Sequence, residues 1–363
     1  MTALTSAPFG RVHIVGTGLL GASIGLALVE RGIEVTLEDQ SPTALTMASD
    51  YGAGVKRTDA HKEPELVVVA VPPDVVADVV KDALERFPEA TVIDVASVKS
   101  GIYDAVAQGS AHSERYVGTH PMAGRERGGA LSARSDLFTA RPWVICANGS
   151  PSAGQVEAFV MSLGAVPIAL SGEDHDKAVA LISHTPQIVS SVMAARLQGA
   201  PEEALALAGG GLRDVTRIAS GDPSLWMQIL RQNAPAIVEH LEALGSDIQS
   251  AVQALTDVDS PESRKVLSAL LLAGNEGVSR LPGKHGVSTQ FASLVVVIDD
   301  RPGQLARLLT QLGEWGVNLE DLRLEHSPGA NVGFAEVTIK KTLRSDVEKK
   351  LVDAGWRIAG QTE

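Results

Sequence analysis

Three groups of residues have types and spacings that could support chemistry, and the first is a run of glycines. Gly16, Gly18 and Gly21 follow a β-branched segment at G-x-G-x-x-G spacing. The first glycine allows a tight turn, the second lets the backbone approach a pyrophosphate, and the third lets helix and strand pack closely. A helix that begins here also presents free N–H groups to that pyrophosphate. The pattern predicts a dinucleotide site at Gly16, Thr17, Gly18, Leu19, Leu20 and Gly21.

An acidic pair follows the next predicted strand, Glu34 to Leu37. An acidic residue about 20 positions beyond such glycines is expected to bind the adenosine ribose hydroxyls. We assign this role to Asp39 rather than Glu38, because Asp39 stands at the strand's end, immediately before a Gln-Ser-Pro turn. A carboxylate repels a 2′-phosphate, so the sequence predicts NAD rather than NADP as the cofactor.

The second group is centred on His120, which precedes a proline in the glycine-rich segment from Gly118 to Gly129. Such a segment is not the interior of a helix, and we expect His120 on a functional loop held by a rigid sheet. The ordinary pKa of histidine lies near neutrality, which suits acid–base catalysis. Other histidines lack a chemical partner nearby in the sequence: His13, His61, His112, His240 and His285.

The third group consists of polar side chains in a helical block. Ser183, His184 and Gln187 fall on adjacent positions of an otherwise apolar helix. Further along, the spacing of Asp214 and Arg217 puts both on one helical turn. A carboxylate that orients a guanidinium prepares it to bind a substrate carboxylate.

A parallel sheet is predicted to position these side chains. After Val12–Val15 and Glu34–Leu37, further strands are predicted over 66–71, 91–95, 116–118, 143–147 and 166–170. The runs over 66–71 and 91–95 are continuously apolar, as is typical of buried parallel strands. Ligands of open parallel sheets bind beyond the carboxyl ends of the strands, so Val71, Pro72 and Ser97 should line the cofactor crevice. We therefore predict an α/β domain, a Rossmann-type doubly wound sheet, over residues 9–171.

An all-helical domain is predicted over residues 172–280. The helix from Asp176 to Leu197 is apolar on nearly every face, so we expect it to be interrupted at Pro186 and buried. Amphipathic helices follow over 233–255 and 261–275. So much apolar surface indicates packing against a second copy, that is, a homodimer.

A third domain is predicted over residues 290–363, after a linker at Leu281 to Gly286. Its expected elements are a strand 292–298, a helix 302–315, strands 317–326 and 332–339 joined by a turn at Ser327, a helix 343–354 and a last strand near Trp356. This β-α-β-β-α-β order is the ferredoxin-like arrangement.

Composition excludes several classes of protein. The 363 residues carry a net charge of −13, which makes a nucleic-acid surface unfavourable. The single cysteine, Cys146, excludes an internal disulfide framework and fits a reducing compartment. We identify neither an apolar run of about 18 residues that would span a membrane nor a signal peptide. We therefore expect a cytoplasmic protein without a membrane or nucleic-acid partner, and we assign no metal site.

Together these motifs resemble the bacterial prephenate dehydrogenase family over essentially the whole chain. The matching residues are Gly16-x-Gly-x-x-Gly21-x-Ser23, Asp94-Val-Ala-Ser97-Val-Lys99, His120-Pro-Met-Ala-Gly124, Ser183-His184-x-Pro186 and Asp214-x-x-Arg217-Ile-Ala-Ser220-x-Asp-Pro-x-x-Trp226. The tail resembles an ACT domain, with Asp300-Arg-Pro302-Gly303 at the start of its first helix.

The resemblance implies NAD-dependent oxidative decarboxylation of prephenate in tyrosine biosynthesis. His120 would accept the proton of the ring 4-hydroxyl as hydride leaves C4, and Ser97 would hydrogen bond both the histidine and the hydroxyl. Arg217 would hold a substrate carboxylate, with Asp214 as its orienting partner. The remaining pocket residues implied by the resemblance are Glu126, which would gate access, Trp226, which would form a wall, and His184.

One position departs from the family pattern. Where many prephenate-using members read His-x-Pro-His, this chain reads His184-Thr-Pro-Gln187. Histidine can be cationic and suits the anionic pyruvyl end of prephenate, whereas neutral glutamine can donate and accept and suits the aminoacyl end of arogenate. Arogenate dehydrogenase therefore stands as an alternative.

Two further classes of protein compete with these. A hydroxyacid-dehydrogenase-like enzyme would bring a catalytic lysine from the helical domain, where the helix over 176–198 carries only Lys177. A non-catalytic NAD and amino-acid sensor would leave the serine, histidine and arginine set unexplained. By the resemblance to ACT domains, tyrosine is the expected effector, bound near Pro302, Gly303 and Asn318.

Overall fold

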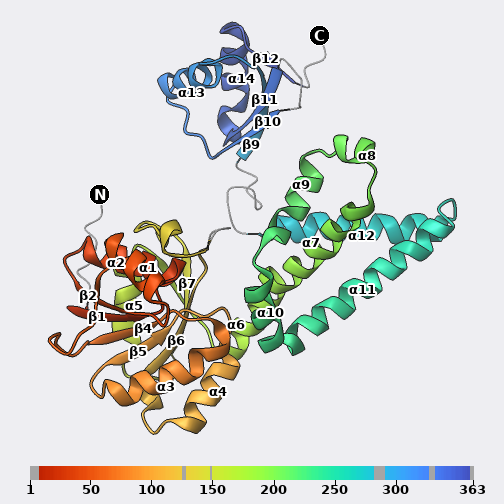
Figure 1. The fold of residues 1–363 in the computed structure, drawn as a ribbon. Helices are drawn as coiled ribbons and strands as arrows, with labels where there is room; N and C mark the ends of the chain where they lie inside the picture. Colours follow the sequence, from red (N-terminus) through yellow and green to blue (C-terminus); the bar gives the residue numbers. More distant parts are fainter. Residues whose placement is uncertain (1–7, 125–127, 148, 282–290, 327–331, 360–363) are drawn as a thin grey trace. The chain divides into compact units, whose positions relative to one another are not determined.

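The strands of the first sheet hold the candidate site. The computed structural model describes residues 8–124, 128–147, 149–281, 291–326 and 332–359 (Figure 1). The predicted linker at 282–286, the turn at 327–330 and the gate residue Glu126 lie outside the described residues. Within the described residues the strands of the first sheet are β1 (Arg11–Val15), β2 (Glu34–Glu38), β3 (Val55–Lys56), β4 (Leu66–Val69), β5 (Thr91–Asp94), β6 (Tyr116–Pro121), β7 (Pro142–Cys146) and β8 (Val166–Ala169).

This sheet has the order β3-β2-β1-β4-β5-β6-β7-β8. Neighbouring strands run parallel except β6 and β7, which pair antiparallel. The strand order reverses between β1 and β4, and ligands of such sheets bind beyond the carboxyl ends at that switch point. The predicted Rossmann-type doubly wound sheet is confirmed.

Helices cover both faces of the sheet (Figure 1). Leu66 and Val68 pack into one core cluster, and Val67 and Val69 into the other. Both faces of β4 are therefore buried, which explains its unbroken apolar sequence. The helices of this part are α1 (Leu19–Val29), α2 (Pro42–Asp50), α3 (Val76–Arg86), α4 (Ser100–Gly109) and α5 (Ala153–Ser162), with short 3-10 turns at Pro73–Val75, Ser113–Arg115 and Ala130–Ser132.

The helical region follows directly. It contains α6 (Gly172–Val179), the π-helical turn η4 (Ala180–His184), α7 (Thr185–Ala195), η5 (Arg196–Gly199), α8 (Glu202–Ala206), α9 (Gly210–Thr216), η6 (Arg217–Ser220), α10 (Pro223–Gln232), α11 (Ala234–Thr256) and α12 (Pro261–Ser279). Capping residues set two of the starts: Ser171 accepts from the N–H of Asp174 before α6, and Asp222 accepts from the N–H of Ser224 before α10.

The predicted helix over 176–197 differs from the observed one. The helix already begins at Gly172, and the π-helical turn stands before Pro186, which lies in the first turn of α7. Pro186 has no N–H for the carbonyl four residues earlier, so a regular α-helix cannot run through this point.

The expectation that this helix is buried was wrong for the single chain. Leu181, Ile182 and Val192 are 57%, 60% and 59% exposed. By length and composition alone, the helical stretch Gly172–Gly199 could cross a membrane. It also carries the buried polar residues His175, Asp176 and His184, so it is not uniformly apolar.

A second sheet lies in the described part of residues 291–359. Its strands β9 (Phe291–Asp299), β10 (Asp321–His326), β11 (Val332–Lys340) and β12 (Arg357–Ile358) have the order β10-β11-β9-β12 and pair antiparallel. The helices α13 (Gln304–Glu314) and α14 (Arg344–Asp353) contribute Leu308, Leu312, Val347 and Leu351 to one core with the sheet. The predicted β-α-β-β-α-β order is observed, with a short 3-10 turn at Lys341–Leu343.

By contacts, the described chain divides into two compact units. One comprises residues 1–199 and 215–243, and the other comprises 200–214 and 244–363. The three domains drawn from the sequence stay a prediction. All of the geometry that follows lies in the first unit unless stated otherwise.

Candidate active site

The glycine loop between β1 and α1 has the backbone that a pyrophosphate site needs. Gly16 has φ of 97°, and a Cβ there would overlap the carbonyl oxygen of Ala70. A Cβ at Gly21 would overlap the carbonyl oxygen of Gly16. A Cβ at Gly18 would meet no heavy atom within 4 Å. The first and third glycines are therefore required by packing, whereas Gly18 faces open space that a ligand could fill.

The start of helix α1 is open to an anion. Gly18 is its N-cap and provides no side chain to accept from the first N–H groups. Leu19 and Leu20 begin the helix, and Thr17 before it is buried. A helix N-terminus without a side-chain cap binds phosphate through its free N–H groups. These residues fit a dinucleotide.

Asp39 follows β2 and faces the glycine loop. Its Oδ2 accepts from the N–H of Thr17 at 2.7 Å and from the Thr17 hydroxyl at 2.8 Å. Glu38 is instead paired with Arg86 at 2.8 Å and hydrogen bonded to His13 at 3.3 Å. The hydrogen bonds from His13 and Arg86 lower the pKa of Glu38 to about 2. Geometry favours Asp39 over Glu38, and its contact with a ribose stays a prediction.

Two other predicted cofactor residues lie in the loop after β4. A Cβ at Gly16 would come within 3.0 Å of Val71 Cγ1, so Val71 lies against the glycine loop. Pro72 follows it and is exposed. The expected contact of Val71 and Pro72 with the cofactor is compatible with this placement.

His120 lies on a strand rather than on the predicted loop. Strand β6 extends to Pro121, because its antiparallel partner β7 pairs His120 with Val144 and Pro121 with Trp143. The prediction stopped the strand at Gly118 because it could not foresee this pairing. As β6 is parallel to β5, His120 lies toward the carboxyl edge of the sheet, where the glycine loop also stands.

His120 begins a chain of hydrogen-bonded side chains. Its Nδ1 lies 2.9 Å from His175 Nε2, and His175 Nδ1 lies 2.8 Å from Asp176 Oδ1. Burial, followed by the neighbouring His175, lowers the pKa of His120 well below 6.5. His120 is therefore neutral at neutral pH and can accept a proton.

The Asp176 carboxylate connects α6 to the start of α4. Its carboxylate accepts from the N–H groups of Lys99 and Ser100, each at 2.8 Å, at the start of α4. Burial alone would raise the pKa of Asp176, but the hydrogen bonds from His175 and Ser100 outweigh it and lower the pKa. Asp176 therefore stays ionised and caps α4 from a neighbouring helix.

His184 is buried beside Trp226. Its Nδ1 lies 3.0 Å from Asn233 Nδ2, which also donates to the carbonyl of Asp176 at 2.8 Å. The His184 and Trp226 rings are 6.1 Å apart at 81°. Burial lowers the pKa of His184 to about 4, so this histidine is neutral as well.

Ser97 lies in the loop after β5 and is half-buried. Among the described residues, the His120 ring is hydrogen bonded to His175 and not to Ser97. Close by in sequence, Lys99 Nζ is paired with Asp94 Oδ1 at 2.5 Å, and both side chains are fully buried. The role of Ser97 toward a substrate stays a prediction.

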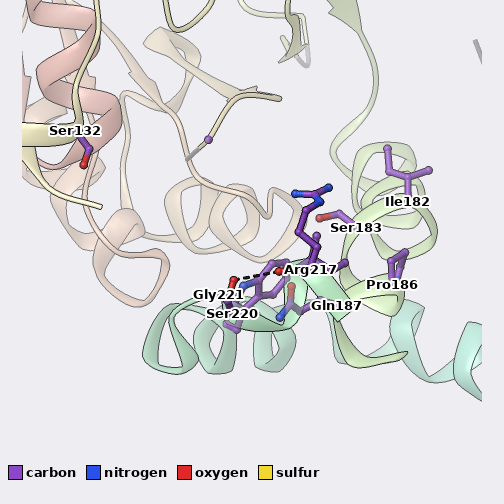
Figure 2. A pocket seen from close by; sticks show the side chains of 11 residues that line it. Ser132, Ile182, Ser183, Pro186, Gln187, Arg217, Ser220 and Gly221 are labelled. Atoms are coloured by element: carbon purple, nitrogen blue, oxygen red, sulfur yellow. Dashed lines mark hydrogen bonds between the residues drawn. The ribbon is translucent and has the colours of Figure 1, made fainter. Parts of the chain in front are cut away.

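A pocket brings several predicted substrate residues together. It has a volume of about 910 Å³ and contains Gln187, Arg217 and Trp226 in its lining. Figure 2 shows Ser183 and Gln187 from the π-helical turn and α7 beside Arg217 of η6, with Ser132 on the far side. Ser220 Oγ donates to the carbonyl of Arg217 at 3.0 Å, and this bond holds the short turn. The full lining is Gly124, Ser132, Ile182, Ser183, Pro186, Gln187, Arg217, Ile218, Ser220, Gly221 and Trp226.

Other predicted residues are not part of this lining. His120, Ser97 and His184 are absent from it, and Asp214 lies within α9 and belongs to the second unit. The predicted effector residues lie near the first helix of the second sheet. Gly303 is the N-cap of α13 with φ of 90°, and Asn318 donates to Glu320 at 3.0 Å. Among the described residues, no group of three or more His, Cys, Asp or Glu could hold a metal ion.

Sequence reasoning missed His175, Asp176 and Asn233. The first two are adjacent, so a His-Asp pair at the start of an apolar helix was a signal that could have been used. Asn233 offered none, because its partners lie 49 and 57 residues away in the chain.

Comparisons with known proteins place the chain among dehydrogenases. The family model described as "Prephenate dehydrogenase, nucleotide-binding domain" matches residues 24–168. The model described as "Prephenate dehydrogenase, dimerization domain" matches residues 171–269. "Probable prephenate dehydrogenase NovF" of Streptomyces niveus is 37% identical over 331 residues, which cover 87% of this chain and 90% of that protein.

Two more distant matches are a sequence relative and a solved structure of similar fold. "Cyclohexadienyl dehydrogenase" of Zymomonas mobilis is 28% identical over 268 residues, which cover 69% of this chain and 90% of that protein. The solved structure of prephenate dehydrogenase from Aquifex aeolicus with hydroxyphenyl propionate and NAD+ is 24% identical. Its TM-score is 0.64, with 73% of this chain and 97% of that chain covered.

Proposed function

The chain belongs to the prephenate dehydrogenase family, and on that premise we propose that it oxidatively decarboxylates prephenate to 4-hydroxyphenylpyruvate with NAD. One observation carries this proposal. His120 is a buried, neutral histidine toward the carboxyl edge of the sheet whose switch point holds the glycine loop. A neutral imidazole at that edge is the base that oxidation of a ring hydroxyl requires.

NAD is the cofactor. The nucleotide-binding family model matches this chain, and the relative from Aquifex aeolicus binds NAD+. The open space at Gly18 and the uncapped start of α1 fit the pyrophosphate, and Asp39 fits the ribose. When bound, NAD supplies the acceptor for the hydride that leaves C4 of the substrate.

The chain's own residues handle the proton and the carboxylates. His120 accepts the proton of the 4-hydroxyl while the C4–H bond breaks and a C4 carbonyl forms. The C1–carboxylate bond then breaks and carbon dioxide leaves. The electron pair of that bond makes the ring aromatic, and the C4 oxygen takes back the proton from His120. Arg217 holds a substrate carboxylate by a charge-assisted hydrogen bond, and Trp226 provides an apolar wall. Ser97 orients the hydroxyl, and Glu126 gates access to the substrate.

The reaction is tested by absorbance at 340 nm. With NAD and prephenate, the purified protein should form NADH and 4-hydroxyphenylpyruvate in equal amounts, with the product identified by chromatography. Absence of NADH formation with both prephenate and arogenate would contradict the proposed function.

Arogenate is a second candidate substrate, and Gln187 favours it. The Gln187 side chain is buried, lines the pocket and lies 3.5 Å from Ser191 Oγ. A neutral amide can accept from an ammonium group, which the cationic form of a histidine cannot. The ratio of kcat/KM for the two substrates decides between them, and Gln187→His should shift that ratio toward prephenate.

We also propose that the protein is a homodimer. The exposed apolar side chains of η4 and α7 lie within the region matched by the dimerization model. Monomeric proteins rarely expose so many large aliphatic side chains along one helical stretch, and such a surface marks an interaction site. Light scattering of the full chain should give twice the monomer mass, whereas a monomer at micromolar concentration would contradict this.

A cytoplasmic location stays a prediction.

The C-terminal sheet is proposed to be an ACT domain that binds tyrosine. Its ferredoxin-like element order and the left-handed Gly303 before α13 support a carboxylate site at that helix N-terminus. Asn318→Ala should weaken tyrosine inhibition of the full-length protein, with Asn275→Ala as the control. Equal inhibition of wild type and Asn318→Ala would assign any tyrosine effect to the catalytic pocket.

A further inference from the structure

We propose that His175 and Asp176 are positioning residues that fix the tautomer of His120, leaving its Nε2 free to receive the substrate proton. This inference rests on the proposed function of His120 as the base. It is carried by a continuous set of hydrogen bonds, from the backbone of α4 through Asp176 and His175 to His120.

The direction of these bonds is set at Asp176. Its Oδ1 and Oδ2 face the backbone N–H groups of Lys99 and Ser100, each at 2.8 Å, and a backbone N–H can only donate. The carboxylate is therefore an acceptor at both oxygens. Oδ1 also lies 2.8 Å from His175 Nδ1, so that nitrogen must carry the proton.

The same reasoning continues to His120. With its single proton on Nδ1, the His175 ring carries its lone pair on Nε2. That atom lies 2.9 Å from His120 Nδ1, so His120 donates from Nδ1. The lone pair of His120 is then on Nε2. His175 is fully buried and His120 is 9% exposed, so water has little access to either ring.

This arrangement has a chemical consequence. When His120 Nε2 receives the hydroxyl proton, the ring becomes an imidazolium. Its Nδ1–H is hydrogen bonded to His175, which is in turn hydrogen bonded to the charged Asp176 carboxylate. The charge stabilises the imidazolium without taking a proton itself, as the aspartate of a Ser-His-Asp triad does. Without the hydrogen bond to His175, the His120 ring could rotate or adopt the other tautomer. The lone pair of His120 would then face the protein interior.

The tautomer can be measured without substrate or cofactor. Ring-nitrogen NMR of the full-length protein labelled with ¹⁵N-histidine should show His120 protonated on Nδ1 and unprotonated on Nε2. His175 should show the same pattern. His120→Gln and His175→Gln assign the signals. A proton on His120 Nε2 in the neutral protein would overturn the proposal.

Two substitutions of His175 separate the tautomer from simple packing. In His175→Gln the side-chain amide can donate to Asp176 and accept from His120, so kcat should stay within about tenfold of wild type. His175→Leu removes both functions and should lower kcat by roughly 10²-fold or more, as loss of a competent base does, with little change in KM. Equal kcat values for the two variants, or a KM effect alone, would contradict the proposal.

A buried histidine elsewhere provides the matched control. His13 is fully buried and also hydrogen bonded to a carboxylate, that of Glu38 at 3.3 Å. Its other ring nitrogen is hydrogen bonded to Thr36 and not to His120. His13→Gln should leave kcat within about twofold, and loss of activity in this variant would mean that kcat reports packing. If the wild-type protein oxidised neither substrate, the proposed function would fail, while the ring-nitrogen spectrum would still decide the tautomer.

Discussion

Asp39 Oδ2 accepts from both the N–H and the hydroxyl of Thr17, at 2.7 and 2.8 Å. The acidic residue after β2 is thereby attached to the glycine loop after β1. Its other oxygen accepts from the N–H of Ser41 at 2.8 Å, so the carboxylate position is fixed before any ligand arrives. A fixed charge beside the loop should discriminate between cofactors that differ by one phosphate.

The first prediction concerns this discrimination. The kcat/KM with NAD should exceed that with NADP by roughly 10²-fold, because placing like charges together costs several kcal/mol. Asp39→Asn keeps a hydrogen-bond acceptor for Thr17 but removes the charge. This variant should therefore lower the ratio of kcat/KM with NAD to kcat/KM with NADP. Asp50→Asn, on the exposed end of α2, is the control. Comparable kcat/KM with both cofactors in the wild type would remove Asp39 from this role.

Arg217 should act on substrate binding rather than on folding. Its side chain lines the pocket and is exposed, so Arg217→Ala should leave the melting temperature unchanged. Loss of a charged hydrogen bond of about 1.5–3 kcal/mol should raise KM by roughly 10- to 150-fold. Arg217→Lys should recover only part of this affinity, because lysine lacks the planar fork. An unchanged KM for Arg217→Ala, with Arg196→Ala as the exposed control, would leave Arg217 without a role in binding.

The buried neutral His184 predicts a loss of stability in acid. Its pKa is about 4 in the folded chain, against 6.5 when unperturbed. As pH falls from 6.5 toward 4, the unfolded chain binds a proton that the folded chain excludes, so stability falls. The free energy of unfolding should drop by about 2 kcal/mol between pH 7 and pH 5 on this account.

His184→Gln isolates that contribution. Glutamine can still accept from Asn233 but does not titrate, so the variant should lose less stability than wild type over the same interval. Urea titrations at pH 7 and pH 5 measure the difference. Identical pH dependence in the two proteins would show that His184 is not held neutral by the fold.

We expect that only glycine fits at position 221, because the Trp226 ring lies against it. A Cβ at Gly221 would overlap the indole Nε1 of Trp226 and approach its Cδ1 to 2.9 Å. Gly221→Ala should therefore displace the ring, raise KM and lower the free energy of unfolding by about 1–3 kcal/mol. Gly154→Ala, in α5 with nothing within 4 Å of the new Cβ, should not destabilise the protein. A KM of Gly221→Ala equal to that of wild type would contradict the prediction, because it would show that displacement of the Trp226 ring does not affect substrate binding.

The parts of the fold and of the site that lie close together in the sequence could be predicted from it. The glycine loop, the strand before it and Asp39 stand within one βαβ segment, and their spacing follows from the geometry of that unit. The order of elements in the second sheet was predictable for the same reason, since each strand and helix has its own periodicity. The parallel strand β4 was evident because both of its faces are buried.

The contacts of the site could not be predicted, because they join distant segments. His120 and His175 are 55 residues apart, and the strand pairing that holds His120 joins β6 to β7 across a long connection. The apolar residues of η4 and α7 predict that these helices are buried. The sequence does not tell whether the covering surface belongs to the same chain or to a second copy. The π-helical turn depends on how Pro186 is accommodated, which periodicity does not encode.

The most direct test of the central claim compares wild type with His120→Gln in NADH formation from prephenate and arogenate, with NAD binding measured on the same samples. His120→Gln should bind NAD normally and lose roughly 10²–10⁴-fold in kcat, the usual contribution of a general base. Turnover by His120→Gln close to that of wild type would contradict it.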